Sequence, residues 1–288
     1  MAKLKVKKQT KRAKKQTRGK PLFRGFPWFV WLAIGLGIIA IAATAVFAYP
    51  WSTSEPVNSA RPGELKAAII DQLYNVQPNQ YFIEQTTQEL QDYGFEVDVY
   101  RGDLVTVDFY RQLPAYGYKL IIFRVHSGVL IGRKDVANKV WLFTSEPYSR
   151  MRHFMEQMTG KVTLATTLGN TPYVFAISAE FVTDSMKEPF NNTAIIMMGC
   201  SCFHFEDLAQ AFIQKGASTY LAWDASVGLN YVDDAATALV EKLCSEGLTT
   251  AKTVAEIMEE KGPDPSWRAV LKYYPPASAD KTLRQLIK

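Results

Sequence analysis

The sequence has little cysteine, and its first segment has no acidic residue at all. Three cysteines among 288 residues are too few for a disulfide-stapled fold of this size, and their odd number leaves at least one thiol unpaired within the chain. Hydrophobic residues make up 48% and charged residues 21%, which excludes a disordered or collagen-like chain. The length allows one good-sized globular domain or two small ones.

The distribution of charge argues against a nucleic-acid-binding surface. The net charge is +5, but 11 of the 33 Lys and Arg lie within residues 1–25, where Asp and Glu are absent. The remaining 263 residues carry 22 basic and 28 acidic groups, a net charge of −6. This balance does not provide the basic face that binds nucleic acid, so we expect no nucleic-acid partner.

Residues 26–49 form a run without a charged residue, FPWFVWLAIGLGIIAIAATAVFAY. As a helix this run covers roughly 36 Å, at about 1.5 Å per residue, and a hydrocarbon core is about 30 Å thick. Trp28 and Trp31 near one end, and Tyr49 and Trp51 at the other, lie where aromatic rings favour the membrane interface. The sequence therefore predicts one transmembrane helix, with the lipid bilayer as its partner.

The basic tail at residues 1–25 sets the predicted orientation of this helix. By the positive-inside rule the tail is cytoplasmic, and everything after Trp51 is extracytoplasmic. A cleaved signal peptide is the alternative, since Ala43, Ala45 and Ala48 would suit a signal peptidase. The apolar run is longer than the usual stretch of about 7–15 residues in such peptides, which favours a retained single-pass anchor in the cell membrane.

A folded domain is expected over residues 64–288, after a linker at residues 50–63 that contains Pro, Ser, Asn and Gly. Its first half alternates strand and helix patterns with short links. The predicted strands are 65–73, 95–100 and 118–128, and the predicted helices are 79–93 and 105–113. This alternation favours an α/β fold with a mostly parallel sheet and helices on both faces.

The second half of the domain is less regular in its middle. Three segments there are predicted as strands or hairpins beside the sheet: 139–146, 161–172 and 173–182. After them the alternation returns. The predicted strands are 191–203, 217–223 and 269–276, and the predicted helices are 205–214, 233–245 and 249–261.

Two of the predicted strands end in residues that can carry chemistry. His126 follows one strand and Cys200 follows another, and ligands of parallel α/β sheets bind beyond the carboxyl ends of the strands. A neutral histidine can take the proton of a nearby thiol, and the thiolate is a nucleophile. Gly199 and Ser201 leave the backbone around Cys200 open, so that its amides can face a developing oxyanion.

The order of these motifs resembles that of the caspase-like cysteine peptidases, and most closely their CHAT and separase branch. The resemblance implies a caspase-like fold with His126 as general base, Cys200 as nucleophile, and the Gly128 and Cys200 amides as oxyanion donors, without a cofactor. Ser127 departs from the family, which usually has glycine directly after the histidine. The matching segments, within residues 65–258, are His126-Ser127-Gly128, Gly199-Cys200-Ser201, LAQAFIQKGA, STYLAWD and DDAATALVEKL.

Asp224 is the candidate for substrate recognition, because it follows the strand at 217–223 and leaves the sheet at the same edge as His126 and Cys200. A carboxylate in the pocket for the residue before the scissile bond would favour a cationic side chain, and Arg over Lys. The segment LAWD resembles the separase-like pattern, which implies the same preference. The alternative is structural, with Asp224 capping the turn that follows it.

The sequence thus predicts a membrane-anchored cysteine endopeptidase that acts on protein or peptide substrates, and several alternatives stay open. The domain could be a catalytically inactive caspase-like module that binds a partner at the cell surface. A redox role for Cys200 and Cys202 conflicts with the usual C-x-x-C spacing. A metal site at Cys200, Cys202 and His204 lacks a fourth ligand. Cys202 and Cys244 could also pair as a disulfide.

Overall fold

The computed structural model describes residues 65–129, 139–167 and 172–288. The predicted basic tail, transmembrane helix and linker, at residues 1–25, 26–49 and 50–63, lie outside this part of the chain. Within the described ranges no helix combines the length and the hydrophobicity needed to cross a bilayer.

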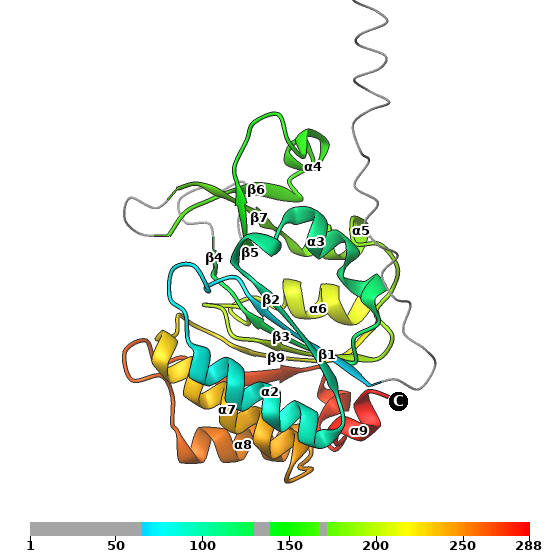
Figure 1. The fold of residues 1–288 in the computed structure, drawn as a ribbon, viewed down its shortest axis with the longest axis vertical. Coiled ribbons are helices and arrows are strands. Elements are labelled where there is room, and N and C mark those ends of the chain that lie inside the picture. The colour runs from blue at the N-terminus through cyan, green and yellow to red at the C-terminus, as the bar shows by residue number, and fades with distance from the viewer. Residues whose placement is uncertain (1–64, 130–138, 168–171) are drawn as a thin grey trace, which may run out of the picture. The chain divides into compact units, whose positions relative to one another are not determined.

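The domain is an α/β fold built on a six-stranded sheet with the strand order β10-β9-β8-β3-β1-β2 (Figure 1). Five strands are parallel, and β10 at one edge runs antiparallel to β9. The mostly parallel sheet expected from the alternating pattern is therefore confirmed. The strands are β1 (Lys66–Asp71), β2 (Glu96–Arg101), β3 (Leu120–Arg124), β8 (Thr193–Met197), β9 (Ala217–Trp223) and β10 (Leu271–Tyr274).

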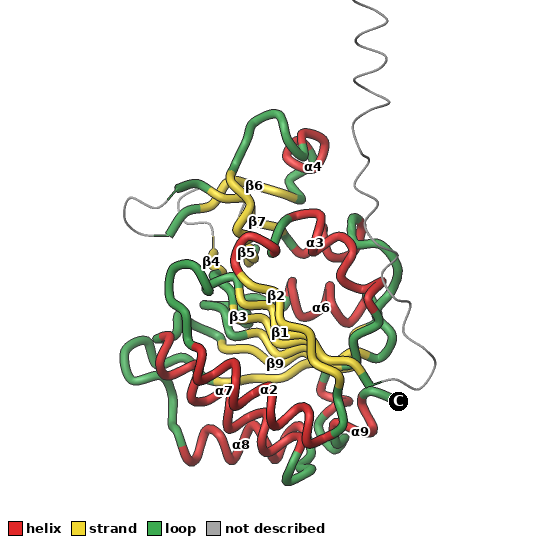
Figure 2. Tube along the Cα trace, in the orientation of Figure 1, coloured by secondary structure: helices red, strands yellow, loops and turns green. Residues whose placement is uncertain are grey.

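Helices cover both faces of this sheet, as expected (Figures 1 and 2). One face packs against α3 (Val107–Gln112), α5 (Ala179–Asp184) and α6 (Asp207–Gln214). The other packs against α2 (Gln80–Tyr93), α7 (Leu229–Cys244) and α8 (Thr250–Glu260). The side chains of β1, β3 and β8 are all buried, because both faces of these central strands are covered.

The first of these helices shows how local sequence sets the element boundaries. The Asn79 side chain accepts a hydrogen bond from the Phe82 amide at 3.1 Å, which caps the start of α2. Gly94 ends the helix in the left-handed conformation, with φ of 107°. The helix predicted at 79–93 is thus confirmed within one residue at its start.

A second, four-stranded sheet is antiparallel, with the order β4-β5-β7-β6. Its strands are β4 (Ser127–Val129), β5 (Val140–Pro147), β6 (Val162–Ala165) and β7 (Val174–Ile177), and the short helix α4 (Phe154–Met158) lies between β5 and β6. Figure 1 places this sheet beyond the end of β3, on the side of α3.

The second sheet corrects two of the predicted strands. The strand predicted at 118–128 ends at Arg124, and the chain then passes into β4, because Ser127–Val129 pairs with β5 rather than with the main sheet. The strand predicted at 173–182 ends at Ile177, after which α5 begins beyond Ser178. The short helix α9 (Leu283–Leu286) was not predicted.

Candidate functional site

His126 and Cys200 leave neighbouring parallel strands at the same edge of the main sheet. In the pairing of β3 with β8, Phe123 lies opposite Met197. His126 follows Phe123 by three residues, and Cys200 follows Met197 by three residues. Both residues lie past the ends of their strands, at equal offsets along the chain from this paired position.

Both residues line one cleft of about 720 Å³, which we call the strand-end cleft. Its volume falls in the range of about 300–1,000 Å³ that is typical of small-molecule and cofactor sites. The described residues that line it are His126, Ser127, Gly128, Val129, Trp141, Phe143, Thr163, Leu164, Ala165, Thr166, Thr167, Cys200 and Ser226.

Cys200 lies in a sharp turn that follows β8. Ser201 adopts a positive φ of 58°, which is uncommon for a residue with a side chain. The turn is held by the Ser201 amide, which donates to the Ala225 carbonyl at 2.9 Å. The Val227 amide lies 3.5 Å from the Cys200 sulfur. Left-handed backbone in non-glycine residues costs about 1–3 kcal/mol and is concentrated at functional sites.

Ser127 connects the histidine segment to the cysteine turn. Its hydroxyl donates a hydrogen bond to the Cys200 carbonyl at 2.6 Å and accepts one from the Cys202 thiol at 3.0 Å. The contact requires glycine at position 199, because a Cβ built on Gly199 would lie 2.2 Å from the Ser127 Oγ. The side chain of Ser127 therefore fits against the turn only because residue 199 has no Cβ.

The three thiols differ in their environment, and all are free. Cys200 is half-buried, whereas Cys202 and Cys244 are buried. Burial raises the pKa of the Cys202 thiol and that of the Cys244 thiol to about 12. Cys202 and Cys244 belong to core clusters on opposite faces of the main sheet, so the disulfide considered from the sequence does not form.

The environment of His126 favours its neutral form. Burial, and then the positive charge of Arg124, lowers the pKa of the imidazole below its ordinary value of 6.5. The His126 amide donates to the Gln72 Oε1 at 2.9 Å, which ties the residue to the segment after β1. The imidazole lies beside Phe143, with 6.1 Å between ring centroids. A neutral imidazole is the form that accepts a proton from a thiol.

Arg124 forms a buried ion-pair network two residues before His126. Its guanidinium donates to Asp71 at 2.8 Å and to both carboxylate oxygens of Asp233 at 2.9 and 3.0 Å. All three side chains are at most 3% exposed. The network joins β1, β3 and α7, and it holds the end of the strand that leads to His126.

Asp224 is placed differently from the other predicted site residues. One carboxylate oxygen accepts from the Val270 amide at 2.8 Å, and the other lies 2.9 Å from the Lys272 ammonium. These partners belong to the edge strand β10 and the residue before it. Asp224 is not among the described residues that line the strand-end cleft, whereas Ser226, two residues later, is.

The two predicted oxyanion donors also differ in setting. Gly128 lies within β4, opposite Trp141 in the antiparallel ladder. Cys200 lies in the turn beyond β8, outside any strand. Both residues line the strand-end cleft.

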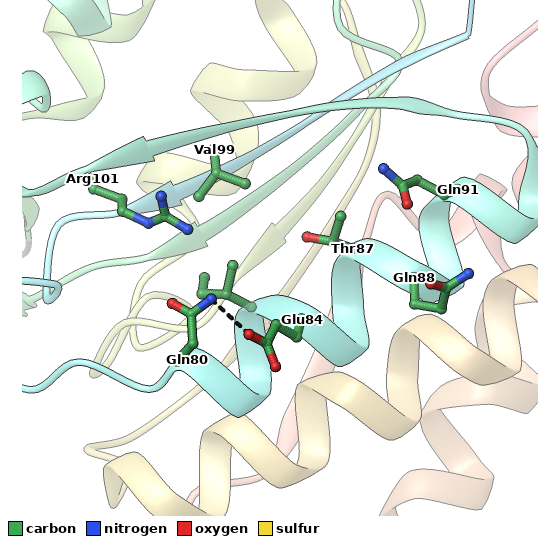
Figure 3. A pocket seen from close by; sticks show the side chains of 8 residues that line it. Gln80, Glu84, Thr87, Gln88, Gln91, Val99 and Arg101 are labelled. Carbon is green, nitrogen blue, oxygen red and sulfur yellow. Dashed lines mark hydrogen bonds between the residues drawn. The ribbon is translucent and has the colours of Figure 1, made fainter.

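Neither the metal site considered from the sequence nor a second hollow in the domain has the groups needed for a catalytic site. In the described part of the chain, no three His, Cys, Asp or Glu side chains are close enough to hold a metal ion. Cys200, Cys202 and His204 therefore do not form a metal site. A second hollow, of about 330 Å³, lies between α2 and β2 (Figure 3). Its lining consists of glutamines, Glu84, Arg101 and small side chains, with neither a thiol nor an imidazole.

Sequence reasoning missed the side chains that form the rest of the cleft. Trp141 and Phe143 in β5, and Thr163 and Ala165 in β6, line it from the second sheet. In β5 a signal was available, because Trp141 and Phe143 alternate with the buried residues Val140, Leu142 and Thr144; β6 shows no such clear alternation. The strands predicted beside the main sheet at 139–146, 161–172 and 173–182 contain β5, β6 and β7, but which of their side chains face the cleft was not predicted.

No protein-family model matches the chain, and no curated protein matches it significantly.

Proposed function

We propose that this domain is a caspase-like cysteine endopeptidase that cleaves protein or peptide substrates with His126 and Cys200. The observation that carries the proposal is the shared position of these two residues, at equal offsets beyond adjacent parallel strands and on one cleft. The lowered pKa of His126 supports its role as a base, and the half-buried position of Cys200 supports its role as the nucleophile.

The proposed reaction begins when His126 accepts the proton of the Cys200 thiol. The thiolate attacks the carbonyl carbon of the scissile peptide bond and forms an S–C bond, while the carbonyl electron pair moves to the oxygen. The intermediate collapses to a thioester, the C–N bond breaks, and the departing amine takes the proton from His126. Water then gives one proton to His126 and forms a C–O bond at the thioester carbon; the C–S bond breaks to release the acid, and His126 returns its proton to the Cys200 sulfur.

The developing oxyanion needs hydrogen-bond donors, and the backbone amides of Cys200 and Gly128 are the proposed pair. We assign the larger share to Cys200, because its amide lies in a turn, whereas Gly128 lies opposite a ladder partner. Donors of this kind are worth roughly 10²–10³ in rate when they are held in place. The proposed steps use groups of the chain itself and require no cofactor.

The location of the activity is part of the same proposal. Residues 26–49 anchor the chain in the cell membrane, the tail at residues 1–25 is cytoplasmic, and the domain acts on the extracytoplasmic side. The test is protease added to intact cells or spheroplasts. The proposal requires digestion of the domain and protection of the tail. Digestion of the tail alone would show that the orientation is the opposite one.

The proposed chemistry is tested by alkylation of the purified full-length protein with iodoacetamide at pH 7.5, read by mass spectrometry. We expect rapid labelling of Cys200 and slow labelling of Cys202 and Cys244, whose raised pKa keeps them protonated. His126→Ala is expected to slow the labelling of Cys200, and His204→Ala, as the matched control, to leave it unchanged. Equal labelling in both variants would favour the catalytically inactive binding module instead.

A further inference from the structure

We infer that the strand-end cleft selects substrates with an apolar side chain on the residue that supplies the scissile carbonyl. The inference rests on the proposed peptidase function, and it names the substrate class of the same site. It differs from the preference for arginine expected from the sequence. The residues that carry it come from the second sheet.

The pairing of the second sheet places the relevant side chains on one face. The Phe143 amide donates to the His126 carbonyl at 3.0 Å, so the two residues lie opposite each other. Ala176 lies opposite Phe143, and Thr163 lies opposite Ala176. Residues that are directly opposite in an antiparallel ladder point to the same side of the sheet. His126, Phe143 and Thr163 therefore share a face.

Most of the other face of the same sheet packs on the core; Leu164, on that face of the edge strand β6, is exposed and also lines the cleft. Leu142, Val162 and Ile177 alternate with the residues that share a face with His126, and all three are buried in the core cluster under α3, α5 and α6. Because side chains alternate along a strand, Trp141 points to the same side as Phe143, and Ala165 to the same side as Thr163. These residues form one wall of the cleft, which we call the β5–β6 wall: Trp141, Phe143, Thr163 and Ala165.

The charge of the lining decides which substrate side chain this wall accepts. Apart from His126 and Cys200, none of the described residues that line the cleft is titratable. Asp224, the candidate partner for arginine, instead contacts Val270 and Lys272. Moving a charged side chain into an apolar site without a partner is costly, whereas an apolar side chain gains about 25 cal/mol per Å² of surface removed from water.

The wall lies close to the reacting groups, so it contacts the side chain of the substrate residue that supplies the scissile carbonyl. Phe143 is in ring contact with His126, and Cys200 lines the same cleft. A carbonyl attacked by Cys200 therefore brings the side chain of its own residue against the β5–β6 wall. Leu, Met or Phe at that position would bury its surface against Trp141 and Phe143.

Thr163 allows a test that reverses the preference rather than only weakening it. It is half-buried in β6, which is an edge strand of the second sheet, so a larger side chain there can extend toward the cleft. The experiment measures kcat/KM for fluorogenic peptides that differ only in the residue before the scissile bond, with Leu, Phe, Arg or Glu there. The enzymes are the full-length wild type, Thr163→Glu, Thr163→Lys and Thr163→Val.

For the wild type we expect Leu and Phe to exceed Arg and Glu by roughly tenfold or more. Thr163→Glu should raise the cleavage of Arg relative to Leu, Thr163→Lys should raise that of Glu, and the isosteric Thr163→Val should keep or sharpen the preference for Leu. Tyr173→Glu is the matched control, because Tyr173 is 58% exposed and does not line the cleft. It should leave all four rates unchanged.

The outcomes separate this inference from the function on which it rests. If the wild type cleaves peptides but prefers Arg or Glu, the inference is wrong and the peptidase function stands. If it cleaves none of them and iodoacetamide labelling of Cys200 does not depend on His126, both fail together. If Thr163→Glu unfolds by circular dichroism, the preference of the wild type and of Thr163→Val still decides.

Discussion

The Ser127 hydroxyl holds the carbonyl of Cys200 at 2.6 Å, and so links the segment that carries His126 to the turn that carries the thiol. The same oxygen accepts from the buried Cys202 thiol at 3.0 Å. One side chain thus fixes the separation of two segments that lie 73 residues apart in sequence. The contact adds a direct link between the two segments to the pairing of β3 with β8.

Ser127→Ala removes the donor to the Cys200 carbonyl and the acceptor of the Cys202 thiol. A hydrogen bond of this kind contributes about 0.5–1.5 kcal/mol, and a buried group left without a partner costs about 1–3 kcal/mol. We expect kcat/KM for peptide cleavage to fall by roughly tenfold while the fold is retained. Ser149→Ala, which removes a hydroxyl outside the cleft, is the control. An unchanged kcat/KM in Ser127→Ala would show that the link does not position the site.

Gly199→Ala should be more severe, because the new Cβ would lie 2.2 Å from the Ser127 Oγ and 3.0 Å from its Cβ. The turn must shift, and we expect loss of activity and a lower free energy of unfolding. Ser127→Gly removes both of those atoms and leaves the Cys202 sulfur, at 2.9 Å, as the remaining close contact, so the double variant should be less impaired than the sum of the single variants predicts. A double-mutant cycle on urea unfolding measures this coupling. Strict additivity would contradict the contact.

The pH dependence of cleavage should reflect the environment of His126. Burial and the charge of Arg124 both oppose protonation, so the pKa of the imidazole lies below its ordinary 6.5. The base is then lost only when the pH falls through this lowered value. We expect kcat/KM, which reports the free enzyme, to show an acid limb below pH 6.5. An acid limb above that pH would mean that another group titrates.

Arg124→Met tests the buried ion-pair network. It leaves the carboxylates of Asp71 and Asp233 buried without their positive partner, which typically costs about 3–5 kcal/mol. The matched control is Lys272→Met, because Lys272 is 49% exposed and its pair with Asp224 is expected to contribute at most about 1 kcal/mol. Urea unfolding of the two variants measures both costs. Similar losses in the free energy of unfolding would contradict the claim that the buried ion pairs of Arg124 matter more to stability than the exposed pair of Lys272.

The main sheet could be predicted from the sequence because its central strands carry a strong local signal. β1, β3 and β8 are short apolar runs, and helices and turn residues separate them along the chain. The placement of His126 and Cys200 at one edge followed from that pattern, since parallel strands end on the same side.

Strands were predicted at the positions of β5, β6 and β7, but their pairing into a second sheet with β4, and the contacts of Asp224, could not be predicted in the same way. β4 has three residues, too few for any period, and its partner β5 follows after a gap in sequence. The contacts of Asp224 depend on β10, which pairs with β9 across 47 residues of intervening chain. The hydrogen bonds of Ser127 could not be predicted either, because its partners Cys200 and Cys202 lie on a turn more than 70 residues away in sequence.

The central claim is that Cys200 is the nucleophile of a peptidase, and matched cysteine variants test it most directly. Peptide cleavage is measured for the wild type, Cys200→Ala and Cys202→Ala, each checked for folding by circular dichroism. The account predicts that Cys200→Ala loses activity by several orders of magnitude, and that Cys202→Ala keeps most of it, because the Cys202 thiol is buried and protonated. Cleavage that survives Cys200→Ala, or is lost equally in both variants, would contradict it.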